Sequence, residues 1–227
     1  MAHFFITGTD TDIGKTYAAC TLIHALRQRF PTRRIAAMKP IAAGTDAEGR
    51  NDDVEQLKAA SNVSLPPELL TPYLFAEPIA PHIAAQMQGV HIDIGRVLQN
   101  FAATAARADQ VIVEGVGGFR VPLNQHEDTA DLAVALNLPI ILVIGLRLGC
   151  LNQALLSIEA IERRGLILAG WVANAIDPTM THAEANLNTL RSRLHAPMLA
   201  HLPFDQKKNT SHAAIHWQTA TNTVIFP

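Results

Sequence analysis

The chain has 227 residues, 48% of them hydrophobic, with 18 basic and 20 acidic residues and a formal net charge of −2. This length and apolar content can bury a substantial core, and we expect one α/β domain spanning residues 1–227. Because there is no excess of positive charge, we expect no nucleic-acid partner and favour small-molecule ligands.

Cysteine usage and hydropathy indicate the cellular compartment that we expect for this protein. Cys20 and Cys150 lie far apart with no C-x-x-C spacing, so neither a disulfide framework nor a zinc site is predicted. Polar residues interrupt every apolar run before it reaches membrane-spanning length, and no signal segment is evident at the N-terminus. We therefore expect a cytoplasmic, unprocessed protein with no membrane partner.

Short apolar or β-branched runs alternate with longer segments of helical periodicity. The apolar runs predict strands at residues 3–8, 34–40, 110–115, 139–145, 168–174 and 197–203. The periodic segments predict helices at residues 15–29, 93–107, 151–164 and 181–194. This alternation is typical of βαβ units and indicates an α/β fold, a parallel sheet with helices on both faces.

Two parts of the chain are less regular. Residues 41–92 contain prolines at 66, 67, 72, 78 and 81, which favour short helices and long loops on the sheet. The tail from Asp205 is polar with scattered apolar residues, and no element is predicted there.

The stretch "GTDTDIGKT" runs from Gly8 to Thr16, between the first predicted strand and the first predicted helix. A phosphate loop of the form G-x-x-x-x-G-K-[ST] has four residues between its glycines, whereas this stretch has five. In such a loop the backbone N–H groups surround an anion, Lys15 reaches the outer phosphates and the Thr16 hydroxyl can ligate Mg²⁺. The stretch predicts a nucleotide-phosphate site, with an ordinary glycine-rich turn as the alternative.

Carboxylates follow two other predicted strands. In "VIVEGVGG", Glu114 ends a buried strand, and Gly115 and Gly117 allow the backbone to approach a ligand. In "GRNDD", Asp52 and Asp53 are either magnesium ligands or part of a helix cap that opens "NDDVEQLKAA".

Lys39 ends the second predicted strand, at the same edge of the sheet as the loop. A lysine at a strand end is usually a solvated flank. Opposite Lys15, however, it can stabilise an anionic acceptor beside the γ-phosphate, where charge grows in the transition state.

Six segments occur in order between residues 7 and 174: "TGTDTDIGKT", "KPIAAG", "EPIAPHIAA", "VEGVGG", "LGCLNQALL" and "GWVAN". Together they resemble the dethiobiotin synthetase family, whose phosphate loop has this longer spacing. The resemblance implies a homodimer with the P-loop NTPase fold that uses MgATP. The implied reaction closes a ureido ring: 7,8-diaminononanoate takes up CO₂ as an N-carbamate, ATP phosphorylates the carbamate, and the second amine displaces phosphate.

The resemblance also implies roles for individual residues. Lys15, Lys39 and Thr11 are the implied catalytic residues, and Thr16, Asp53 and Glu114 the implied Mg²⁺ ligands. The implied ATP-binding residues are Asp12, Ile13, Gly14, Lys15, Thr16, Tyr17, Asp53, Glu114, Gly115, Val116, Gly117, Asn174, Ala175, Leu202, Pro203 and Phe204. The implied substrate-binding residues are Lys39, Ala43, Gly149, Cys150 and Asn152, the last three at a helix start that would bind the distal carboxylate.

Ala43 departs from the family pattern. Relatives commonly have Ser or Thr before the glycine of "KPIAAG", whereas this chain has Ala43. A hydroxyl contact to the substrate is therefore missing, or Thr45 supplies it.

Two other functions compete with this interpretation. A partitioning or assembly switch ATPase would carry a second, early lysine in a K-G-G-x-G-K-[ST] loop, which "TDTDIGKT" lacks. An amidotransferase-linked ATPase of cobalamin synthesis would need a glutaminase domain, for which this chain has no room.

Overall fold

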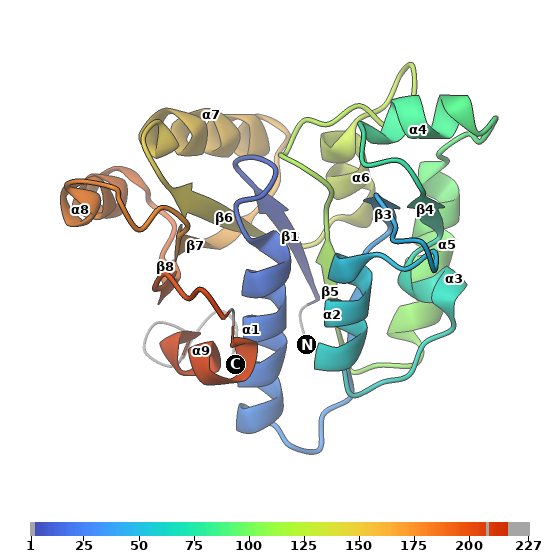
Figure 1. Cartoon of the computed structure of the whole chain (residues 1–227), viewed down its shortest axis with the longest axis horizontal. Coiled ribbons are helices and arrows are strands. Elements are labelled where there is room, and N and C mark those ends of the chain that lie inside the picture. Colours follow the sequence, from blue (N-terminus) through green and yellow to red (C-terminus); the bar gives the residue numbers. More distant parts are fainter. Residues whose placement is uncertain (1–2, 208, 218–227) are drawn as a thin grey trace.

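A computed structural model describes residues 3–207 and 209–217 (Figure 1). Its main sheet is parallel, with the strand order β2-β5-β1-β6-β7-β8. The strands are β1 (Phe4–Gly8), β2 (Ile35–Met38), β5 (Gln110–Glu114), β6 (Ile140–Leu146), β7 (Leu168–Ala175) and β8 (Met198–Leu202). All six predicted strands and the α/β class are confirmed.

Helices cover both faces of this sheet. One face carries α1 (Lys15–Arg29), α2 (Asp52–Ala60), α9 (Thr210–Ala213) and the 3₁₀ turn η1 (Ala214–Trp217). The other carries α5 (Ile94–Ala105), α6 (Thr129–Leu136), α7 (Cys150–Arg163) and α8 (Ala183–Arg193). The four predicted helices are confirmed with small shifts at their ends, whereas α6 was not predicted.

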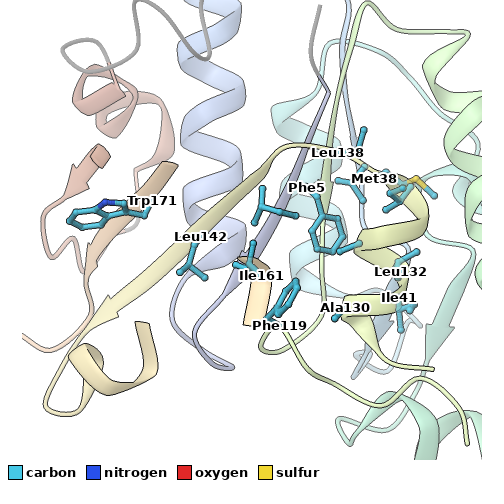
Figure 2. Packing of buried hydrophobic residues seen from close by; sticks show 14 of the residues in the cluster. Phe5, Met38, Ile41, Phe119, Ala130, Leu132, Leu138, Leu142, Ile161 and Trp171 are labelled. Atoms are coloured by element: carbon cyan, nitrogen blue, oxygen red, sulfur yellow. The ribbon is translucent and has the colours of Figure 1, made fainter. Parts of the chain in front are cut away.

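The strands are largely apolar because each one contributes to two cores. In β1, Phe4 and Ile6 pack with α1, whereas Phe5 packs with the helices of the opposite face. Figure 2 shows the second core, a cluster of buried side chains that includes Phe5, Met38, Phe119 and Leu132 of α6. Side chains alternate across a strand, so a strand covered on both faces needs apolar residues at odd and even positions alike.

Residues 41–92 contain α2 and two further short helices, α3 (Pro67–Leu70) and α4 (Pro81–Met87). The short helices were predicted, but the segment also holds an unpredicted pair of parallel strands, β3 (Ile41–Ala43) and β4 (Tyr73–Phe75). Asn51 caps α2, since its side chain accepts a hydrogen bond from the N–H of Val54. This cap fixes the start of the helix that carries Asp53.

The last two described elements, α9 and η1, pack against α1. Figure 1 shows α9 beside that helix. Trp217 is fully buried, and its indole N–H donates to the hydroxyl of Thr21 at 2.8 Å. Thr21 in turn donates to the carbonyl of Ala18, one turn earlier in the helix. Residues 210–217 thus belong to the same layer as α1.

Across the described ranges, we find no helix that combines the length and the apolar character needed to cross a membrane.

Candidate active site

The carboxyl ends of the parallel strands meet at one edge of the sheet, and the candidate site lies there. The phosphate loop follows β1, Lys39 follows β2 and Glu114 ends β5. Asn174 lies near the end of β7, and Pro203 follows β8. In open α/β sheets, ligands bind at this edge.

A cavity of about 360 Å³ opens at this edge, a size suited to a small-molecule ligand. Its lining includes many of the predicted residues: Thr11, Asp12, Gly14, Lys15, Thr16, Tyr17, Asp53, Glu114, Asn174, Ala175, Pro203 and Phe204. It also includes three that the sequence analysis did not assign to the site: Gln56, Ile176 and Asp205. The structure therefore brings the loop, α2, β5, β7 and the segment after β8 around one cavity.

The remaining predicted residues do not line this cavity. Ile13 and Leu202 are buried in the apolar core beneath it. Outside the lining also lie Lys39, Ala43, Gly115, Val116, Gly117, Gly149, Cys150 and Asn152. The side chain of Cys150 is fully buried, and its backbone N–H donates to the carbonyl of Arg147.

The phosphate loop has two residues in the left-handed region of backbone conformation. They are Asp12, with φ of 56°, and Gly14, with φ of 81°. The helix α1 begins at the next residue, Lys15, whose Nζ donates to the carbonyl of Asp10 at 2.8 Å. The loop thus delivers a lysine to the N-terminus of a helix, where the helix dipole favours anions.

A buried charge cluster lies beside the loop. The Lys39 ammonium bonds to Glu114 Oε1 at 2.8 Å and makes a short contact with Asp53 Oδ2. Thr16 Oγ1 donates to the same Glu114 oxygen at 2.7 Å. Glu114 is 0% exposed and Lys39 4%, so each charge depends on the other for compensation.

Lys39 of this cluster and Lys15 of the neighbouring loop have pKa values shifted in opposite directions. For Lys39, burial lowers the pKa, but the carboxylates of Glu114 and Asp53 outweigh burial and hold it above its ordinary value. For Lys15, burial lowers the pKa and Lys39 lowers it further, against the opposing effect of Glu114. Lys39 is therefore a firmly held cation.

The oxygen atoms beside the loop fit a magnesium ion. Mg²⁺ in nucleotide sites takes one or two carboxylates and completes its shell with phosphates and water. Thr16, Asp53 and Glu114 supply a hydroxyl and two carboxylates, and Glu114 Oε2 is buried without a protein partner. Across the described ranges, this site included, no group of three or more His, Cys, Asp or Glu side chains could hold a metal ion, so a magnesium ion here would depend on the Thr16 hydroxyl, phosphates and water beside the two carboxylates.

Asn174 supports the loop from β7. Its Nδ2 donates to the carbonyl of Ile13 at 2.8 Å, which fixes the plane of the carboxamide beside the cavity.

One polar group that the sequence analysis missed joins the loop to the segment after β6. Asp10 bonds to Arg147 and to Gln153, which is on α7. Arg147 lies two residues beyond the predicted strand 139–145, so its place at the same sheet edge was the available signal.

The comparisons with known proteins show the family to which this chain belongs. Residues 2–211 match the profile of a family described as an AAA domain. The ATP-dependent dethiobiotin synthetase of Aromatoleum aromaticum is 53% identical over 203 residues, covering 88% of this chain and 89% of that protein. The chain belongs to the dethiobiotin synthetase family.

Solved structures show that the fold of this dethiobiotin synthetase family member is shared more widely. The MinC:MinD cell division complex of Aquifex aeolicus matches with a TM-score of 0.59 at 15% identity, covering 95% of this chain and 93% of that one. A ParA family ATPase of Chlorobium tepidum matches with a TM-score of 0.55 at 15% identity, covering 96% and 91%. At these identities the likeness concerns the fold alone.

We expect Gly14→Ala to disrupt nucleotide binding. Its φ of +81° is unfavourable for alanine, and the added Cβ would lie 2.2 Å from Nδ2 of Asn174, which must then release Ile13. Gly49→Ala is a matched control, because its φ is +76° but nothing lies within 4 Å of the added Cβ. Backbone strain costs roughly 1–2 kcal/mol in both variants, so strain alone cannot make them differ. Calorimetric titration should show weaker ATP binding in Gly14→Ala only. Equal affinities in the two variants would contradict this.

The Asp53 carboxylate should contribute to acid stability. Burial raises its pKa, but Lys39 outweighs burial and holds the pKa below the ordinary 3.8. The folded state therefore binds fewer protons than the unfolded state, so the contribution is present above pH 3.8 and is lost as pH falls through the folded pKa. In urea unfolding with EDTA, the free energy of unfolding should fall more steeply below about pH 4 in the wild type than in Asp53→Asn. Parallel curves for the two proteins would exclude this role.

Proposed function

We propose that this chain is an ATP-dependent dethiobiotin synthetase. It forms the ureido ring of dethiobiotin from 7,8-diaminononanoate and CO₂ and releases ADP and phosphate. The observation that carries the proposal is the Lys39 cation held between Asp53 and Glu114 beside the phosphate loop. The 53% identity to a protein of that name supports the same reaction.

The reaction has three steps. One amine of the substrate attacks CO₂ and loses a proton, giving an N-carbamate. A carbamate oxygen attacks the γ-phosphorus of ATP, ADP leaves, and a carbamic-phosphoric anhydride forms. The second amine then attacks the carbonyl carbon and expels phosphate, which closes the ring.

The main obstacle is electrostatic, because an anionic carbamate must approach the anionic γ-phosphate. We assign Lys15 to the phosphates, which requires its ammonium to leave the carbonyl of Asp10. We assign Lys39 to the acceptor side, where its raised pKa keeps it charged, and Thr11 to the loop beside it. Phosphoryl transfer depends mainly on positioning and charge, so these groups can provide most of the catalysis.

Thr16, Asp53 and Glu114 are the residues that would hold Mg²⁺. When bound, the ion neutralises phosphate charge.

We assign the rest of the cavity to the nucleoside. The fixed carboxamide of Asn174 offers its oxygen to an amino group of the base. Tyr17, Ala175, Pro203 and Phe204 supply apolar surface on the same wall. Asp12 and Gly14 provide loop backbone around the phosphates.

The substrate end of the site is assigned more coarsely. Gly149 and Asn152 are at the start of α7, where free N–H groups can bind the distal carboxylate. Ala43 lacks a hydroxyl, and the half-buried Thr45 is the nearest residue in sequence that has one.

We further propose a single cytoplasmic domain over residues 1–227 that acts as a homodimer. The buried, unpaired Cys20 and Cys150 fit a reducing compartment. Next to Gly149, Leu148 is 95% exposed, and Leu156 on α7 is also exposed, as expected of a surface that meets a second copy. Sedimentation velocity measures this oligomeric state directly.

Incubation with MgATP, bicarbonate and 7,8-diaminononanoate should yield dethiobiotin, detected by mass spectrometry, with one ADP per product. Reactions without the diamine are the control and should give little ADP. ATP hydrolysis that is independent of the diamine, with no ureido product, would instead support a switch ATPase.

Lys39→Gln and Lys15→Gln should each lower kcat by orders of magnitude, because each removes a cation that offsets charge in the transition state. Circular dichroism should show both variants folded, with Lys39→Gln the less stable of the two because Glu114 loses its compensating charge. Lys58→Gln is the control, since Lys58 is exposed on α2 and pairs only with Glu55 in a surface ion pair. Wild-type turnover in either site variant would remove that lysine from the mechanism.

A further inference from the structure

Asp10 connects the phosphate loop to the segment that leads into α7. Its Oδ2 accepts hydrogen bonds from Arg147 Nη2 at 2.5 Å and from Gln153 Nε2 at 3.1 Å. Its Oδ1 accepts from the backbone N–H of Thr11 at 2.8 Å, and its backbone carbonyl accepts from Lys15 Nζ. One residue therefore contacts the loop backbone, the loop lysine and two residues far away in sequence.

The arrangement differs from an ordinary surface ion pair. The side chains of Arg147 and Asp10 are 41% and 42% exposed, and such a pair alone adds little to global stability. Both carboxylate oxygens are used, however, and three different donors point at them. These bonds fix the position of the phosphate loop and add little to the stability of the whole fold.

The longer loop has particular need of such support. It carries one residue more than the usual phosphate loop and two left-handed residues, Asp12 and Gly14. Few bonds hold its first half: Thr9 N–H donates to Val143 on β6, and the next contacts are those of Asp10. Arg147 follows β6, so both bonds tie the loop to the same neighbouring strand.

We propose that Asp10 is a positioning residue that, through Arg147 and Gln153, holds the phosphate loop in register with the first turn of α7. The proposal rests on the proposed function only in assigning the substrate carboxylate to that turn. With the link intact, the N–H groups of the loop are in place before nucleotide arrives. Without it, ATP binding must include the cost of ordering the loop.

The test is a double-mutant cycle read out as the ATP dissociation constant by calorimetry, without diamine. Asp10→Asn keeps an acceptor for Thr11 but turns an amide donor toward the donors of Arg147 and Gln153. Arg147→Gln removes the other end of the link. Each should weaken ATP binding by on the order of tenfold, and the double variant should be no weaker than the weaker single, because both changes break one link.

Two further variants separate positioning from general structure. Arg164→Gln breaks a pair of the same 2.5 Å length, with Asp131 on α6, and should leave ATP affinity unchanged. Arg147→Lys should recover most of the affinity, because a single nitrogen of Arg147 makes the bond to Asp10. Thermal midpoints of the Arg147 and Arg164 variants should agree closely.

Unchanged ATP affinity in both single variants, or effects that add fully in the double variant, would overturn the proposal. A similar loss of affinity in Arg164→Gln would do the same. Nucleotide binding is measured without the diamine, so these outcomes do not depend on which reaction the enzyme catalyses. With dethiobiotin formation as a second readout, Arg147→Gln should also raise the KM for the diamine. Failure of the wild-type protein to form any dethiobiotin would count against the proposed function alone.

Discussion

The site depends on one buried carboxylate, Glu114, and on the cation that compensates it. A lone carboxylate with no exposure to water would be costly, and removing one member of a buried pair leaves the other uncompensated. Lys39 meets this need from β2, Thr16 adds a hydrogen bond from α1, and Asp53 completes the cluster from α2. The elements α1, β2 and α2, which all lie well before β5 in the sequence, are thereby fixed around it. The charges that we assign to phosphoryl transfer are also those that orient the surrounding elements.

The sheet was predictable because its strands are buried on both faces and read as continuous apolar runs. The same reasoning failed where burial is partial. The small β3–β4 sheet has only three residues per strand, and the exposed Leu74 lies within it, so neither strand stands out from the loops around it. The eight-residue α6 has a buried apolar stretch but begins at a capping box that was not recognised, Asp128 with Asp131.

The site was predictable to the extent that its residues lie at strand ends. Lys39, Glu114 and Asn174 follow this rule, and Asp53 was marked by its acidic neighbours at a helix start. Gln56 and Asp205 line the cavity by helical and loop geometry, for which one sequence gives no signal. The link from Asp10 to Arg147 spans 137 residues, and only the three-dimensional arrangement shows it. Leu202 was predicted to line the base pocket because it precedes Pro203 and Phe204, but its side chain is fully buried and does not reach the cavity.

The burial of Trp217 against α1 has a consequence for the order in which the protein is made. The helix that begins at the phosphate loop is synthesised early, within the first thirty residues, yet the indole that covers it belongs to the last described turn. On the ribosome, every strand of the sheet can be complete while this face of α1 still lacks its cover. The layer that α1 begins thus gains this cover only after all six strands of the main sheet have been synthesised.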